Sequence, residues 1–186
     1  AFAFTNENIS RRNPLYRDPI ADADQSQPEL VSAGREKFEG ATAEVRLKVS
    51  DVWSLRGRTA YTDATTEESP DLPDEVGRAI SRVPSWTGAL SSLHRWSKGP
   101  LTGWSISNSL IFIGGYVDTY ADRRRAELRY PGYKYVSTSL SYRWKVGKKT
   151  HYISARVRNI FNENLLVKAA RPGADRYASL GYRLYF

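Results

Sequence analysis

The chain has 186 residues, a formal net charge of +8, and 12% aromatic residues. It contains no Cys, which excludes a disulfide framework and thiolate metal chemistry. No stretch is long and apolar enough for a membrane helix. A basic, Tyr-rich composition suits a nucleic-acid-binding protein, but it also suits a membrane barrel with lumenal arginines and aromatic girdles. Because Met is absent and Ala1 falls within a strand-like pattern, we expect a further N-terminal portion ahead of this chain.

The residues alternate between apolar and polar along most of the chain, which indicates β-strands. After an opening strand with Phe2 and Phe4 on one side, a loop rich in Pro and Asp leads to a long strand. Gly34 and Gly40 are expected to allow bends or bulges in that strand. The predicted strands are residues 1–11, 29–50, 52–65, 83–97, 101–116, 133–146, 150–161 and 176–186.

In most of these strands one parity is apolar and the other polar. The strand at 133–146, for example, has Leu140, Tyr142 and Trp144 on one side and serines on the other. The last strand alternates in the same way and ends at Phe186. The strand at 83–97 is the exception, because its alternation does not reveal which face points outward.

The predicted connections alternate between long and short. The short turns lie at 51, 98–100 and 147–149, and long loops lie at 12–28, 66–82, 117–132 and 162–175. Outer-membrane barrels are built with short turns at one end and long loops at the other, with polar side chains toward the lumen. We therefore predict an all-β, antiparallel, up-and-down segment of a transmembrane β-barrel with about eight strands.

Three stretches resemble the C-terminal barrel portion of TonB-dependent outer-membrane receptors, the siderophore and cobalamin uptake family. The first is Arg158-Asn159-Ile160-Phe161-Asn162. The second is the ending, where a loop containing Gly173 and then Arg176 lead into a last strand closed by Phe. The third is the pair of strand starts at Val83-Pro84 and Pro131-Gly132-Tyr133, and the stretch from Gly34 to Glu44 is similar to the long strand that precedes them.

The resemblance implies that residues 1–186 are the C-terminal portion of a 22-stranded barrel in the outer membrane of a Gram-negative bacterium. It implies a receptor that imports a ferric siderophore or a similar scarce ligand, energised through the TonB complex. By the same resemblance, we expect the plug domain and the TonB-interacting segment to be absent from residues 1–186. Outer-membrane lipid, lipopolysaccharide and the barrel-assembly machinery are the other expected partners.

Three groups of residues are candidate sites. An outer loop cluster can recognise anions through guanidinium hydrogen bonds. A second group is expected to face the lumen and the plug, and the third is an assembly signature in the last strand. The loop cluster is Tyr120, Arg123, Arg124, Arg125, Arg129 and Tyr130; the lumenal group is Arg56, Arg58, Arg143, Arg156 and Arg158; the assembly signature is Tyr182, Leu184 and Phe186.

No catalytic set, metal site or cofactor is indicated, so we do not expect an enzyme. His94 and His151 lie in different predicted strands without a further ligand at metal-binding spacing. Two alternatives remain open from the residues. One is a self-contained eight-stranded outer-membrane barrel acting as an adhesin or structural protein, and the other is a soluble basic β-domain that binds single-stranded nucleic acid through stacked tyrosines.

Overall fold

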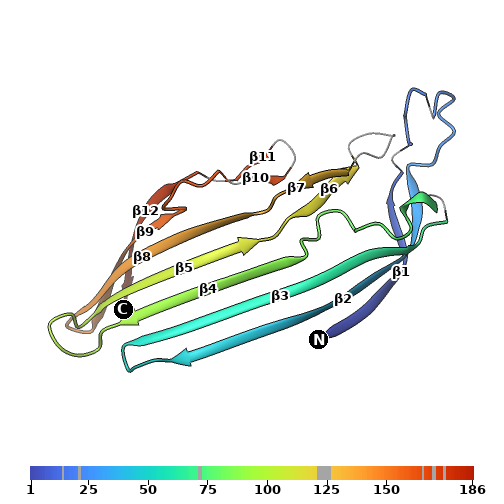
Figure 1. Cartoon of the computed structure of the whole chain (residues 1–186). Helices are drawn as coiled ribbons and strands as arrows, with labels where there is room; N and C mark the ends of the chain where they lie inside the picture. Colours follow the sequence, from blue (N-terminus) through green and yellow to red (C-terminus); the bar gives the residue numbers. More distant parts are fainter. Residues whose placement is uncertain are drawn as a thin grey trace. The chain divides into compact units, whose positions relative to one another are not determined.

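The structure is a computed structural model that describes the whole chain except residues 14, 21, 71–72, 121–126, 165, 169–170 and 174. The described part is built from strands and one short 3-10 helix (Figure 1). The elements are β1 (Phe2–Arg12), β2 (Leu30–Lys48), β3 (Trp53–Glu68), η1 (Pro73–Glu75), β4 (Trp86–Arg95), β5 (Trp104–Ile113), β6 (Tyr116–Tyr120), β7 (Glu127–Tyr130), β8 (Tyr133–Val146), β9 (Lys149–Arg158), β10 (Leu166–Lys168), β11 (Arg171–Pro172) and β12 (Tyr177–Tyr185). Among the described residues, no helix has the length and apolar character needed to cross a membrane.

Eight strands form one sheet in the order β1-β2-β3-β4-β5-β8-β9-β12, which is also their order along the chain. The pairs with a defined register are antiparallel. This confirms the prediction of about eight antiparallel, up-and-down strands. The order ends at β1 and at β12, and no ladder joins these two strands in the part of the chain that the structure describes.

Two predicted loops contain regular structure. Within 117–132, β6 pairs with β7, and within 162–175, β10 pairs with β11. The interpretation of these segments as loops without strands was wrong, because short hairpins carry too few residues for their alternation to stand out. The β4–β5 connection is also longer than predicted and takes residues 96–103.

The chain divides into two compact units. Unit 1 comprises Ala1–Ala41, Tyr61–Trp86 and Gly115–Pro131, and unit 2 comprises Thr42–Ala60, Thr87–Gly114 and Gly132–Phe186. Three of the long connections belong to unit 1, and the three short turns belong to unit 2.

In unit 1, two glycines explain the geometry of β2. Gly34 has a φ of +73° and lies where the pairing of β1 with β2 shifts register, so it forms the predicted bulge. A Cβ on Gly40 would lie 2.1 Å from the Tyr61 carbonyl oxygen and 2.6 Å from the Phe2 ring, so only glycine fits there. The connection after β1 is braced by the buried carboxylate of Asp22, which accepts hydrogen bonds from the Arg17 and Gln27 amides at 2.6 and 2.8 Å.

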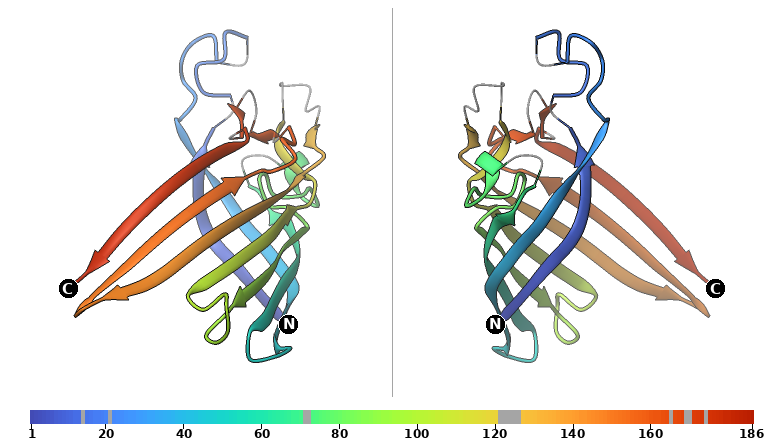
Figure 2. Two further views of the ribbon diagram at one scale, coloured as in Figure 1. Left: turned by 90° about the vertical axis from the view of Figure 1, so that its left-hand side faces the viewer. Right: turned by 90° about the vertical axis from the view of Figure 1, so that its right-hand side faces the viewer.

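In unit 2, the register defines two faces across β4, β5, β8, β9 and β12. Ile106, Leu140, Ala155 and Leu180 are successive partners in one row, and Ser105, Ser141, Ser154 and Gly181 are successive partners in the next row. Because partners in antiparallel strands point to the same side, the first row belongs to an apolar face and the second to a polar face. Figure 2 shows β8, β9 and β12 running side by side, as these rows require.

Almost no hydrophobic side chain is buried. In the described residues, the buried hydrophobic residues are Ala64, Val117 and Tyr135. Large apolar side chains on the apolar face stay exposed, including Leu180 at 76% and Leu90 at 51%. A soluble domain buries such a surface, so a face left bare over several strands indicates contact with another apolar medium.

Candidate functional site

The polar face of unit 2 is basic and rich in Ser. In the register, serines of β5 lie opposite serines of β8, and the Ser105 and Ser141 hydroxyls hydrogen-bond at 2.8 Å. Arg156 follows in the row of Ser107 and Ser139, and Arg143 lies in a row with Tyr152. Since β4, β5, β8, β9 and β12 contain no Asp or Glu, these strands supply no carboxylate to neutralise the arginines.

A first hollow of about 320 Å³ opens on this face between β5, β8, β9 and β12. Arg156, Arg158, Tyr135 and Tyr177 line it together with the serines. Arg158 donates from Nη2 to the Tyr135 hydroxyl at 3.0 Å, and its guanidinium carbon lies 4.9 Å from the Tyr135 ring centroid. Its Nε is buried without a hydrogen-bond partner among the described residues, so the guanidinium keeps unused donor capacity.

A second hollow of about 380 Å³ lies nearer the short turns. Arg95 of β4, Arg143 of β8 and Arg183 of β12 line it, with Tyr152 and Tyr185. The register pairs Tyr152 with Arg143 on one side and with Arg183 on the other. No Asp or Glu lines the hollow, and none of the three arginines forms an ion pair within the described residues.

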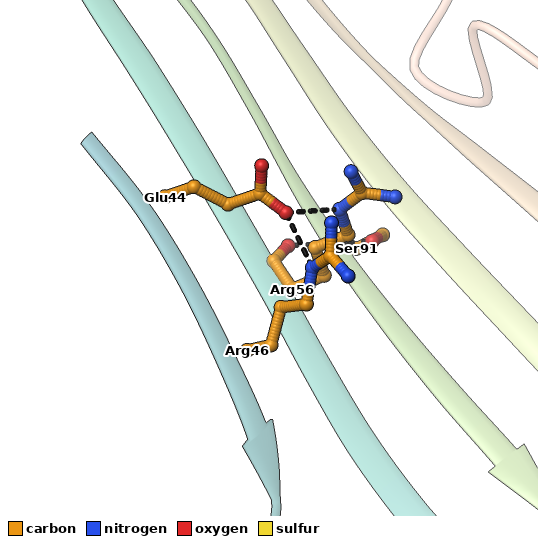
Figure 3. A network of polar contacts seen from close by, with 4 residues as sticks. All are labelled: Glu44, Arg46, Arg56 and Ser91. Carbon is orange, nitrogen blue, oxygen red and sulfur yellow. Dashed lines mark hydrogen bonds and ion pairs between the residues drawn. The ribbon is translucent and has the colours of Figure 1, made fainter. Parts of the chain in front are cut away.

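Arg56 has a different environment, shown in Figure 3. Its Nε donates to Glu44 Oε1 at 2.9 Å, and Arg46 donates to the same carboxylate oxygen. The Ser91 hydroxyl donates to the Arg56 carbonyl oxygen at 3.3 Å. Glu44 of β2 therefore neutralises part of the positive charge of β3. Arg58, also in β3, is exposed and forms no ion pair within the described residues.

The apolar face carries a belt of rings near the short turns. Trp53 stacks on His94 at 5.3 Å between centroids, and its Nε1 donates to the Ser92 hydroxyl at 3.0 Å. The register pairs His94 with Ile106, so Ser92 and His94 belong to the apolar face, which settles the outward face of the strand predicted at 83–97.

A second run of rings crosses β5, β8, β9 and β12 through Trp104, Tyr142, Trp144, His151 and Tyr182, with successive centroids 4.8 to 6.1 Å apart. Tyrosines and tryptophans at the end of an apolar band form the girdle of a membrane barrel at the lipid–water interface.

The predicted site residues fall into different environments. Arg143, Arg156 and Arg158 lie on the polar face, and Arg56 and Arg58 share a parity with the polar face of β3. In the loop cluster, Arg123, Arg124 and Arg125 lie outside the described residues, and so does the side chain of Tyr120. Arg129 is exposed, and Tyr130 stacks on Tyr116 at 5.5 Å between centroids.

The residues of the assembly signature lie at the turn end of β12. The Tyr182 hydroxyl and His151 Nδ1 hydrogen-bond at 2.7 Å, and Leu184 is paired with His151 in the register. Phe186 is 90% exposed, with Lys149 Nζ 5.0 Å from its ring centroid.

Sequence reasoning missed Arg95, Arg183, Tyr152 and Tyr185 as site residues. The alternation within each strand already put Tyr152, Arg183 and Tyr185 on the polar side, as it put Arg143 on the polar side of its own strand. Their convergence depends on the register between strands, which the sequence does not state.

The family model of the TonB dependent receptor-like β-barrel matches residues 8–162. The chain belongs to the TonB-dependent receptor family, as part of its β-barrel. This is a receptor family of the Gram-negative outer membrane, and the match confirms the predicted resemblance. A search of curated protein sequences finds no match.

Solved structures of receptors share the fold. BauA, the ferric preacinetobactin receptor from Acinetobacter baumannii, is 16% identical with a TM-score of 0.69, over 98% of this chain and 26% of that one. The ferric-catecholate import receptor Fiu from E. coli K12 is 18% identical with a TM-score of 0.65, over 98% and 24%. The ferric yersiniabactin uptake receptor FyuA from Yersinia pestis is 19% identical with a TM-score of 0.59, over 83% and 23%.

The chain thus spans about a quarter of the length of the solved structures it matches.

Proposed function

We propose that this chain is the C-terminal wall and part of the outer loops of a TonB-dependent receptor that imports a ferric siderophore or a similar scarce ligand. The observation that carries the proposal is that this chain, a member of the family, forms a sheet with one apolar and one polar face. Its apolar face is bare and ends in a ring belt, and its polar face is basic and without carboxylates on β4, β5, β8, β9 and β12. The role is one of binding and transport rather than of catalysis.

The apolar face would contact outer-membrane lipid, because exposed Leu and Val side chains gain free energy when they leave water. Full burial of one such side chain contributes about 1.5–3 kcal/mol. The long connections would then face the cell exterior, near lipopolysaccharide, and the short turns would face the periplasm.

The polar face would line a lumen filled by a plug domain that lies outside this chain. A 22-stranded barrel with a plugged lumen needs strands beyond the eight present, and β1 and β12 each have a free edge among the described residues. Because a free edge presents unpaired backbone groups, we propose that other strands of the same receptor pair with both. The barrel-assembly machinery would recognise the turn end of β12, where Tyr182, Leu184 and Phe186 lie.

Ligand capture would involve the outer loop cluster with Arg123, Arg124, Arg125, Arg129, Tyr120 and Tyr130. Ferric siderophores that are anionic would match these guanidinium groups, which bind oxygen anions through charge-assisted hydrogen bonds. TonB would drive release by rearranging the plug.

The test is uptake of radioactive iron by an iron-limited strain whose only siderophore receptor is the full receptor carrying this chain. A panel of ferric hydroxamate, catecholate and citrate complexes is offered with TonB present and absent. We expect uptake of at least one complex, abolished without TonB or after collapse of the proton gradient. Uptake that persists without TonB would contradict the energised mechanism. No uptake of any complex would contradict the proposal that the ligand is a ferric siderophore.

A further inference from the structure

We propose that the hollow lined by Arg95, Arg143 and Arg183 is a binding seat for carboxylate side chains of a segment of the same receptor outside residues 1–186. The inference deepens the proposed function, because it rests on a lumen filled by another part of the polypeptide. It names the chemistry of the contact and its place on the wall.

The first argument is the geometry of the hollow. The register aligns Arg143, Tyr152 and Arg183 in one row over three adjacent strands, so the two arginine Cα atoms are about 10 Å apart. Arg95 reaches the same hollow from β4, where it is paired with Ser105. A volume of about 380 Å³ leaves room for acidic side chains between the three guanidinium groups.

The second argument is charge. Three arginines from three strands share one hollow, and neither its lining nor the strands that form it contain Asp or Glu. Carboxylates match the planar fork of guanidinium and can accept two hydrogen bonds from one arginine. The Tyr152 and Tyr185 hydroxyls can donate to the remaining carboxylate oxygens.

The third argument is the contrast with Arg56 on the same sheet. There the chain supplies its own carboxylate, because Glu44 accepts hydrogen bonds from both Arg56 and Arg46. Glu44 therefore neutralises Arg56 and Arg46 from within the sheet, whereas the lining of the hollow at β4, β8 and β12 contains no Asp or Glu. A protein segment held in the lumen neutralises the hollow between transport events, whereas a passing ligand would leave the three arginines together at those times.

The experiment replaces Arg143 or Arg183 by lysine in the full receptor and treats the purified protein with a water-soluble carbodiimide. This reagent joins an amine to a carboxylate only when the two are in contact, and it leaves as its urea. Mass spectrometry of the digested protein then identifies the carboxylate partner. Arg143→Lys and Arg183→Lys keep the charge, and a heat-modifiability gel verifies that each variant is folded.

Two positions calibrate the reaction. Arg56→Lys should couple to Glu44, because their side chains already form an ion pair at 2.9 Å. Lys134 is on the apolar face, paired with Phe112, and sets the background. We expect lysine at 143 or 183 to couple to an Asp or Glu outside residues 1–186, well above the yield at Lys134.

The proposal is overturned if Arg56→Lys couples to Glu44 while lysines at 143 and 183 stay at background, since the hollow then holds water or a free anion. It is equally overturned if they couple to a carboxylate within residues 1–186. Iron uptake by the same variants is measured separately. Coupling in the variants, together with no uptake by the unsubstituted receptor, would refute the import role and leave the contact with the hollow intact. Uptake by the unsubstituted receptor without coupling in the variants would refute the contact alone.

Discussion

An arginine placed at Leu140 should destabilise the folded receptor strongly, whereas an arginine at Val146 should not. Both residues lie in β8 on the apolar face, and both are exposed in the bare sheet, at 43% and 60%. They differ in depth. Leu140 lies in the row of Ile106, Ala155 and Leu180, and Val146 lies at the short turn beyond the ring of Trp144.

The depth follows from strand geometry. Leu140 precedes Trp144 by four positions, which at about 3.4 Å per residue is about 14 Å along the strand. With a tilt of about 45° this becomes about 10 Å of depth, close to the middle of an apolar band about 25 Å tall. Arginine facing lipid there costs about 2–4 kcal/mol, against about 0–1 kcal/mol near the interface. Leu140→Arg should therefore lower the folding equilibrium constant by about 30- to 1,000-fold, and Val146→Arg by less than about tenfold.

The assay is urea unfolding of the full receptor in lipid vesicles, followed by the fraction that keeps its folded mobility in an unheated gel. Parallel unfolding in detergent micelles serves as the control, because a small micelle deforms around a charge more readily than a bilayer does. The reasoning fails if the two variants lose equal stability, or if Leu140→Arg unfolds like the unsubstituted receptor.

Three further predictions concern single contacts. Gly40→Ala should lower the free energy of unfolding by about 1–3 kcal/mol, because the added Cβ clashes with the Tyr61 carbonyl and the Phe2 ring. The control is Gly57→Ala, whose Cβ would lie 3.7 Å from Leu90 and which should keep the urea midpoint of the unsubstituted receptor. Similar midpoints for the two variants would contradict this prediction. Asn159 is fully buried and hydrogen-bonds both the amide and the carbonyl of Glu163. Asn159→Ala should therefore lower the free energy of unfolding by about 1–3 kcal/mol and speed proteolysis after β9. An unchanged cleavage rate would show that these hydrogen bonds do not stabilise the segment. A hydrogen bond from Lys48 and its charge lower the pKa of Asp51 in the turn after β2. This pair therefore stabilises the fold above the ordinary carboxyl pKa and stops doing so as pH falls through the lowered value. The difference in stability between Lys48→Gln and the unsubstituted receptor should disappear in acid, and a difference independent of pH would contradict the assignment.

Membership of each side chain in the apolar or polar face was predictable wherever the alternation is clean. Ser139 and Leu140 lie on opposite sides of β8 because neighbouring side chains of any strand point in opposite directions, whatever the strand pairs with. The glycines within the long strand predicted bends or bulges there, of which the bulge at Gly34 is one. The arrangement of long and short connections predicted an up-and-down sheet.

The tertiary structure decided what depends on pairing between strands. It placed His94 and Ser92 on the apolar face, where Trp53 contacts both, although their polarity had left β4 ambiguous. It joined Arg56 to Glu44 across β2 and β3, and it brought Arg95, Arg143 and Arg183 from three strands into one hollow.

The physical reason is that alternation is a property of one strand, whereas a row of side chains is a property of the register. Register depends on turn lengths, bulges and the packing of every neighbour at once, and a slip by one residue would move a whole strand to the opposite face. The sequence alone therefore determined the class of fold and, in the strands with clean alternation, the two faces. Only the assembled sheet determined the faces of β4 and which charges on the polar face meet.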